Sequence, residues 1–179
     1  KTLVRNAIQM DADFRAIMTE KAQRLTGLSN PNSVSQLKAW LEDKIQRPIA
    51  SLDKKAIAEM LGDSSLPSIA HEVLVTRQQL GKTSVKKYQA MANALTRDGR
   101  IHGMFQFYGA MRTGRWAGRI VQLHNLPQNH MELAELDAAR SMVMKGDMEA
   151  LSLCYHSIPD VLSQLIRTAI EAEPGHRFI

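Results

Sequence analysis

Apolar residues recur every three to four positions through most of this 179-residue chain, which is the spacing of amphipathic α-helices. The first such pattern covers residues 3 to about 25 and predicts a helix that Gly27 ends. A second helix is expected after Ser33, because Ser33 and Gln36 have the spacing of a capping box that satisfies free backbone N–H groups. Pro48 is expected to end that helix. Further helices are predicted over residues 51–61, 131–144, 148–155 and 159–172.

A longer helical pattern begins at Pro67, a residue suited to a first helical turn, and continues to residue 95. Gly81 lies inside this pattern and is expected to bend or interrupt the helix. Asp98 and Gly99 then indicate a turn, and alternation between residues 101 and 107 predicts a strand over residues 100–108. The arginine-rich segment that follows is expected to be a loop. The sequence therefore predicts an α+β fold that is predominantly α-helical.

The two ends of the chain suggest that it is an incomplete fragment of a larger protein. It begins with Lys1 rather than methionine, and Phe178 and Ile179 follow a Pro174-Gly175 turn signal. These last two residues are typical of the start of a buried strand, so the chain stops where we expect a strand to continue. The alternative is a short terminal strand docked on a complete fold.

Positive charge is concentrated in one segment of the chain. The formal net charge is +5, but residues 77–119 contain nine Lys and Arg and a single acid, Asp98. The remaining residues contain 14 basic and 17 acidic side chains. Such a cluster favours a polyanionic partner, with a solvated lysine-rich helix face as the alternative.

Other classes of protein find little support in the sequence. It contains no run of eighteen apolar residues and no signal peptide, so we expect no membrane association. Cys154 is the only cysteine, which fits a reducing compartment and a cytoplasmic location. The six histidines lack metal-ligand spacing, and Cys154 and His156 lack a third group that would orient a catalytic pair. We therefore expect no catalytic residue and no metal ligand in this chain.

The segment from Arg112 to Pro127 is the strongest candidate for a binding site. Its glycines allow close backbone approach, and its arginines supply rigid forks of hydrogen-bond donors. Arg115, beside a glycine, is suited to a minor groove, where purine N3 and pyrimidine O2 acceptors occur in every base pair. Trp116 and Tyr108 could stack on bases, although such residues more often belong to the core. The DNA-binding candidates of this segment are Arg112, Thr113, Arg115, Arg119, Gln122, His124 and Asn125.

A second group of candidates lies upstream, in the basic part of the long helical pattern. Lysine and hydroxyl side chains contact phosphates, which positions a duplex without reading its sequence. The DNA-binding candidates of this group are Arg77, Lys82, Thr83, Ser84, Lys86 and Lys87.

Four segments of the chain resemble motifs of the family A DNA polymerases, the group similar to bacterial DNA polymerase I, and in particular its phage and prophage branch. Asn32-Ser33-Val34-Ser35-Gln36-Leu37 resembles the start of a thumb helix, and residues 77–88 resemble the long helix that leaves the thumb. Asp98-Gly99-Arg100-Ile101-His102 is similar to the hairpin that enters the palm. Thr113-Gly114-Arg115, with residues 122–127, is similar to the segment that lies along the minor groove of the primer–template. The motifs follow the family's order and spacing over nearly the whole chain.

The resemblance implies a division into two parts. Residues 1–97 would form a thumb-like helical region, and residues 98–179 would form the N-terminal part of a palm, truncated before the first catalytic aspartate. Arg115 would contact the minor groove near the primer terminus, whereas Gln122, His124 and Asn125 would contact template or primer. Lys82, Thr83 and Ser84 would contact the backbone of the duplex.

The resemblance also implies an activity for the intact protein. It would be a DNA-directed DNA polymerase that uses primer–template DNA, deoxynucleoside triphosphates and Mg²⁺, in a bacterial cytoplasm and encoded by a phage or prophage. This chain alone is expected to be inactive and to bind no Mg²⁺. The sequence leaves two alternatives: a stand-alone, non-enzymatic nucleic-acid-binding module and a helical protein-interaction domain.

Overall fold

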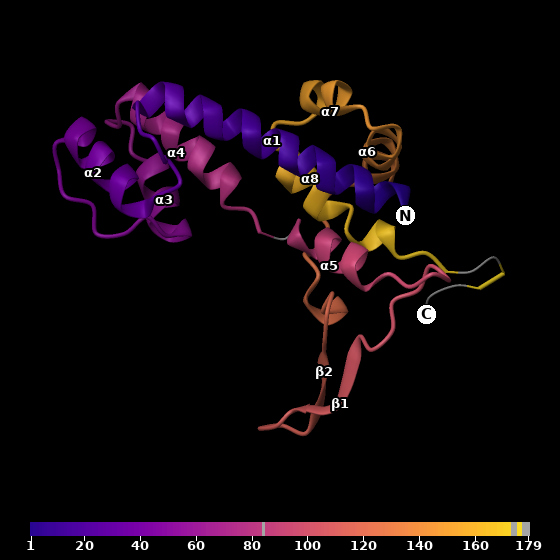
Figure 1. Ribbon diagram of the computed structural model, residues 1–179. Helices are drawn as coiled ribbons and strands as arrows, with labels where there is room; N and C mark the ends of the chain where they lie inside the picture. Colours follow the sequence, from indigo (N-terminus) through magenta and orange to yellow (C-terminus); the bar gives the residue numbers. More distant parts are fainter. Residues whose placement is uncertain (84, 173–174, 177–179) are drawn as a thin grey trace. The chain divides into compact units, whose positions relative to one another are not determined.

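The computed structural model describes residues 1–83, 85–172 and 175–176, which form mainly helices (Figure 1). These residues contain eight α-helices, one two-stranded antiparallel sheet and two short 3-10 helices. The predicted α+β, predominantly helical fold is therefore confirmed. The strand expected at Phe178 and Ile179 lies outside the described residues, and so do Pro174 of the predicted turn and Ser84.

The chain divides into two compact units, one of residues 12–82 and one that combines residues 1–11 with residues 83–179. Helix α1 (Thr2–Thr26) contributes its first turns to one unit and the rest of its length to the other. The assignment of residues 1–97 to a thumb and residues 98–179 to a palm concerns function rather than compactness, and it stays a prediction.

The 12–82 unit is built from helices around an apolar core. It contains α2 (Val34–Ile45), α3 (Lys54–Leu61) and α4 (Ser68–Leu80), and both α2 and α3 pack against α4. Apolar side chains from these helices and their connections are buried together, as the helical periodicity predicts. The buried core residues are Leu37, Leu41, Ile49, Leu52, Ile57, Ala70, Val73 and Leu74.

Local signals explain where the first three helices begin and end. Helix α1 stops one residue before Gly27, whose φ of 71° is left-handed, as predicted. The Ser33 hydroxyl accepts a hydrogen bond from the Gln36 backbone N–H, so the predicted cap of α2 is confirmed. Asp53 caps α3 in the same way, which is why this helix begins at Lys54 rather than at residue 51.

The prediction of one continuous helix from Pro67 to residue 95 is wrong. Helix α4 ends at Leu80, and a separate helix, α5 (Lys86–Ala94), follows. The break falls at Gly81, where an interruption was predicted. The Arg15 guanidinium donates hydrogen bonds to the carbonyls of Leu80 at 2.9 Å and Lys82 at 2.7 Å. These carbonyls are thereby satisfied at the helix end without a further helical turn.

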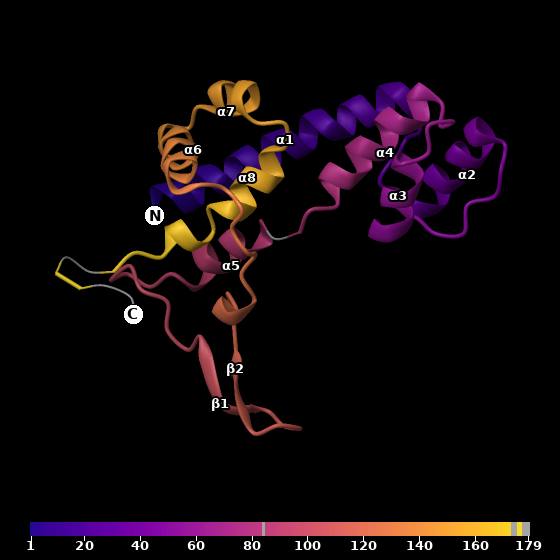
Figure 2. The same cartoon turned by 180° about the vertical axis from the view of Figure 1, so that it is seen from behind.

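The other unit combines helices with a β-hairpin that projects beyond them in both views (Figures 1 and 2). The hairpin consists of β1 (Phe105–Ala110) and β2 (Arg115–Gly118). Besides α5 and the first turns of α1, this unit contains α6 (Leu133–Lys145), α7 (Met148–Cys154), α8 (Ile158–Gln164) and the 3-10 helices η1 (Leu123–Asn125) and η2 (Arg167–Ala169).

Side-chain hydrogen bonds join distant segments of this unit. The Asn6 side-chain amide donates to the carbonyls of Val143 at 2.9 Å and Met144 at 3.1 Å, which ties the start of α1 to the end of α6. The buried Tyr88 hydroxyl donates to the Leu162 carbonyl at 2.7 Å and so joins α5 to α8.

Two further predictions about this unit need correction. The expected strand over residues 100–108 begins only at Phe105, because Thr96 and Arg100 close a tight turn upstream and Ile101 forms just an isolated bridge with Leu95. The helix expected over residues 159–172 ends at Gln164, and the chain continues into η2. There the Leu165 carbonyl accepts the Thr168 backbone N–H at 3.0 Å, which is a 3-10 and not an α-helical bond, and it also accepts the Thr168 hydroxyl at 2.8 Å.

Replacing Tyr88 by phenylalanine is expected to lower the free energy of unfolding by about 1–3 kcal/mol, because the buried Leu162 carbonyl would lose its partner. Burial also raises the pKa of Tyr88 above its ordinary value. Urea unfolding followed by circular dichroism measures the change. Tyr155→Phe is the matched control, because the Tyr155 hydroxyl is more exposed and 3.4 Å from its acceptor. Equal losses of unfolding free energy in Tyr88→Phe and Tyr155→Phe would contradict a stabilising role for the Tyr88–Leu162 hydrogen bond.

Candidate nucleic-acid interface

The β-hairpin is irregular, and its aromatic residues are exposed. Phe105 pairs with Gly118 and Ala110 pairs with Arg115, but three residues of β1 stand opposite Trp116 alone. This insertion is a β-bulge, a feature that bends a strand and redirects its side chains. Tyr108 lies within it and has a left-handed φ of 53°.

The aromatic side chains of the hairpin form an exposed cluster rather than part of the core. Phe107 is 72% exposed, Trp116 is 63% exposed and Tyr108 is 58% exposed. The rings of Phe107 and Trp116 meet edge to face with centroids 5.3 Å apart, and Tyr108 is tilted against Phe107 at 6.3 Å. The expectation that Trp116 and Tyr108 more often belong to the core is therefore wrong for this chain.

A glycine fixes the tip of the hairpin in front of Arg115. The backbone N–H groups of Thr113 and Gly114 both donate to the Ala110 carbonyl, at 3.0 and 2.9 Å. Gly114 has a φ of 66°, and a Cβ at this position would lie 2.8 Å from the Tyr108 ring. Arg115 follows as the first residue of β2 and not as part of a loop, which corrects the sequence-based expectation.

After β2 the chain folds back in a compact segment, the 119–125 turn. A Cβ on the buried Gly118 would collide with the His124 ring and would lie 3.2 Å from the Gln122 Cα, so glycine permits this close approach. Within the turn, the Gln122 N–H donates to the Arg119 carbonyl at 3.0 Å, and the Asn125 N–H donates to the Gln122 carbonyl at 2.8 Å.

The backbone of the 119–125 turn is strained. Ile120 and Gln122 have left-handed φ values of 58° and 52°, which non-glycine residues rarely adopt and β-branched residues avoid. Val121 between them is fully buried, whereas Gln122, His124 and Asn125 are exposed. The turn thus has an apolar anchor on one side and hydrogen-bonding side chains on the other.

Lys87 connects the basic helix α5 to this turn. Its ammonium donates to the Val121 carbonyl at 2.7 Å, and partial burial lowers the pKa of Lys87. Lys86, the next candidate on the same helix, is exposed. The two lysines are therefore differently placed, with one already engaged by the protein.

The hairpin and the turn carry positive charge without nearby acids in sequence. Residues 101–125 contain no Asp or Glu, and Arg112, Arg115 and Arg119 are all exposed. Asp98, just upstream, accepts a hydrogen bond from the Thr96 hydroxyl and another from the Arg100 N–H. These bonds lower the pKa of Asp98 to about 2, so the carboxylate is engaged in its own turn.

Apart from Lys87, the predicted site residues fall into three groups. All seven candidates between Arg112 and Asn125 are exposed on the hairpin and the turn, and Thr83 and Lys86 are exposed in the same unit. Arg77 and Lys82 are partly buried and belong to the 12–82 unit. Ser84 lies outside the described residues. Sequence reasoning missed Phe107 and the Lys87–Val121 contact, since neither exposure nor a contact across 34 residues leaves a local signal.

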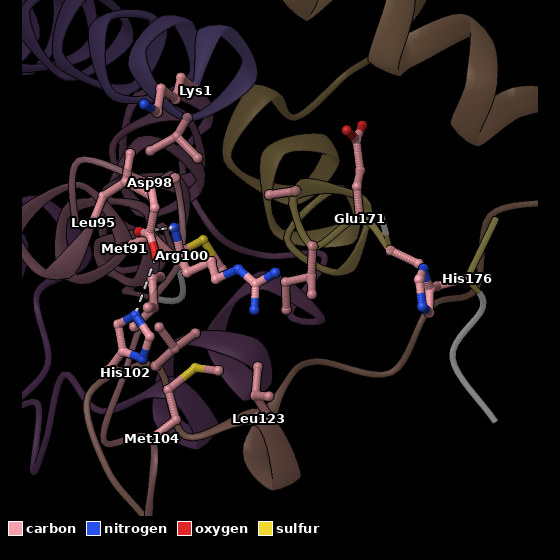
Figure 3. Close-up of a pocket in the computed structure, with 17 residues that line it drawn as sticks. Lys1, Met91, Leu95, Asp98, Arg100, His102, Met104, Leu123, Glu171 and His176 are labelled. Atoms are coloured by element: carbon pink, nitrogen blue, oxygen red, sulfur yellow. Dashed lines mark hydrogen bonds and ion pairs between the residues drawn. The ribbon is translucent and has the colours of Figure 1, made fainter. Parts of the chain in front are cut away.

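A cavity of about 660 Å³ lies beside the turn, with Val121 and Leu123 in its wall (Figure 3). Asp98 and His102 lie on one side of it, 3.5 Å apart at their closest side-chain atoms, and Glu171 lies on the other side. Its lining mixes both signs of charge with apolar side chains. Across the described residues, no three His, Cys, Asp or Glu side chains gather as metal ligands. No described helix is long and apolar enough to cross a membrane.

The chain is mainly helical, and it presents a hairpin that contains arginine and aromatic residues and no acidic residue. Comparison with known proteins adds a relative: the chain is 50% identical over 176 residues to a protein of Bacillus phage SP02 named DNA polymerase. The match covers 98% of this chain and 26% of the relative, so the chain spans about a quarter of that protein's length. The predicted similarity to a phage DNA polymerase is confirmed. No family model and no solved structure matches the chain.

Proposed function

We propose that this chain is the duplex-gripping part of a family A DNA polymerase, comprising the thumb and the first part of the palm. The observation that carries the proposal is the exposed, acid-free surface of the hairpin and the 119–125 turn. Its arginine, amide and imidazole groups suit a nucleic-acid duplex, and the chain that carries them is 50% identical to part of a phage DNA polymerase.

Hydrogen-bonding chemistry supports a minor-groove role for this surface. Arg115, Gln122 and Asn125 are exposed donors, and the minor groove presents N3 and O2 acceptors in every base pair. Contacts to these shared acceptors would test the shape of a base pair without reading its sequence. Trp116 and Tyr108 would stack on unpaired bases, since base–aromatic stacking tolerates every sequence.

Backbone contacts would come from the second group of candidates. Lys86 and Thr83 are exposed and would contact phosphates of the duplex. Lys87 would act mainly through the Val121 carbonyl that its ammonium already contacts. Binding would therefore combine a salt-sensitive phosphate component with a groove component.

The intact enzyme would extend a primer on a DNA template with deoxynucleoside triphosphates. Its Mg²⁺ ions would stabilise the attacking and leaving oxygens of nucleotidyl transfer. The part of the chain that the structure describes offers no cluster of three potential ligands for such ions, so no catalytic step is assigned to its residues. Their proposed contribution is to bind and orient primer–template DNA.

Lys86→Ala is expected to flatten the dependence of duplex affinity on salt, because each lost phosphate contact reduces the slope of log K against log salt by about 0.9. Affinity should fall by a similar factor for duplexes of unrelated sequence. Fluorescence anisotropy over a salt series measures both quantities. Lys55→Ala, a change of another exposed lysine in α3, is the control. Equal slopes of log K against log salt for the two variants would contradict a phosphate contact by Lys86.

A further inference from the structure

The strained 119–125 turn requires anchors outside itself. Left-handed φ values at non-glycine residues are unfavourable and persist only where surrounding contacts enforce them. Upstream, the Lys87 ammonium holds the Val121 carbonyl between the two strained residues. A second set of contacts lies downstream, on residues 126–130, and none of these residues is among the proposed DNA contacts.

The centre of this downstream set is a two-point contact between Gln164 and His130. Gln164, at the end of α8, is only 2% exposed. Its Oε1 accepts a hydrogen bond from the His130 backbone N–H at 2.8 Å, and its Nε2 lies 3.2 Å from His130 Nδ1. Because the backbone N–H can only donate, the oxygen must face it, and the amide nitrogen must donate to Nδ1.

This geometry defines the protonation state of His130 in the contact. A nitrogen that accepts from Gln164 carries no proton, so the neutral ring holds its proton on Nε2. His130 Nε2 lies 3.3 Å from an Asp160 carboxylate oxygen, which accepts that proton's hydrogen bond. Asp160 and Gln164 thus hold both sides of the imidazole from one helix.

Arg167, in the following 3-10 helix η2, extends the contact along the chain. Its Nε lies 3.3 Å from the Pro127 carbonyl, and a terminal guanidinium nitrogen lies 3.4 Å from the Leu126 carbonyl. These carbonyls come directly after Asn125, the last residue of the turn. The region of α8 and η2 therefore holds the exit of the turn at three residues.

We propose that Asp160, Gln164 and Arg167 form a clasp on residues 126–130 that positions the 119–125 turn for duplex DNA. The inference rests on the proposed function, because the turn is useful only if its exposed side chains bind a duplex. The clasp residues are positioning residues: they act through the backbone of the turn's exit and through His130, and need not touch DNA.

Replacing Gln164 by glutamate should give the clasp a dependence on pH. A proton on Nδ1 would face the Gln164 amide donor and break that contact, while it would strengthen the ion pair between His130 and Asp160. In Gln164→Glu, a carboxylate oxygen replaces that donor and can accept only from a protonated Nδ1. The variant clasp should therefore form in acid and weaken as the pH rises. Asp160 faces the other ring nitrogen in both proteins.

The test measures anisotropy of a labelled primer–template duplex with the 179-residue chain between about pH 5.5 and pH 8. Gln89→Glu, an equal charge change on an exposed glutamine of α5, is the matched control. The affinity of Gln164→Glu relative to this control is expected to fall about fivefold as the pH rises. Parallel pH profiles for both variants would overturn the clasp. A general loss of structure would lower affinity at every pH rather than mainly at the higher pH.

A second readout does not depend on DNA. Imidazole ¹⁵N spectra should show His130 with its proton on Nε2 in the unaltered chain, assigned by comparison with His130→Asn. A neutral His130 with its proton on Nδ1 would overturn the clasp. Duplex binding that is lost in Arg115→Ala but unchanged in Gln164→Leu would also overturn it while leaving the proposed function intact. Absence of duplex binding by the unaltered chain would overturn the proposed function and the positioning role together, even if the Nε2-protonated form of His130 were found.

Discussion

Gly118→Ala is expected to weaken duplex binding about tenfold or more while leaving the helices folded. The added methyl group would collide with the His124 ring and would press on the Gln122 Cα at 3.2 Å. Displacing these two residues would remove the hydrogen bonds that we propose they make to the bases, each worth about 1–3 kcal/mol, and 1.4 kcal/mol corresponds to a factor of ten. Fluorescence anisotropy with a primer–template duplex measures the loss, and circular dichroism checks the helices.

Two controls separate this collision from a general effect of replacing glycine. Gly62→Ala introduces a methyl group that meets only ordinary contacts, and it should leave affinity unchanged. In a His124→Ala background the ring is absent, so Gly118→Ala should reduce duplex affinity by a smaller factor than it does in the unaltered chain. Full additivity of the two substitutions would contradict the packing of His124 on Gly118 as the cause.

Arg115→Ala is expected to weaken duplex binding by about 1–3 kcal/mol, because the substitution removes a charged fork of donors from the first residue of β2. Arg115→Lys should recover little of the lost affinity, since an ammonium cannot reproduce the planar fork of donors. The loss should be similar for duplexes of different sequence, because minor-groove acceptors are shared by all base pairs. Anisotropy with two duplexes of unrelated sequence tests both statements.

In a full-length polymerase, Arg115→Ala is expected to have a more specific effect. Primer extension should slow, and by different factors from a matched and a mismatched primer terminus, because a mismatch moves the groove acceptors. Arg24→Ala, which removes an exposed arginine of α1, is the surface control. Equal slowing at both termini would remove the minor-groove role of Arg115.

Local patterns were sufficient to predict most helices of this fold. The periodicity of residues 3–25 and the serine cap at Ser33 appear in the structure as α1 and the start of α2. The helical pattern after Pro67 is interrupted at Gly81, as that glycine indicated, but its division into two separate helices depends partly on Arg15, about 65 residues away, which donates hydrogen bonds to the carbonyls at the break. A contact of that separation leaves no trace in a window of neighbouring residues.

The candidate site was predicted in its charge but not in its shape. The basic segment and its glycines are evident in the sequence, yet the four residues of β2 are too few to show alternation and follow a glycine typical of loops. The strand exists because its partner is β1, and its register depends on a bulge at Tyr108. The contacts of Lys87 and Gln164 with the turn and its exit likewise join segments 34 residues apart.

The most direct test of the account is the affinity of this chain for a primer–template duplex over a salt series, measured by fluorescence anisotropy. The account predicts that log K falls linearly with log salt and that, at each salt concentration, Arg115→Ala binds more weakly than Arg24→Ala. Binding that does not respond to salt, or equal affinities for the two variants, would contradict a surface built to hold duplex DNA.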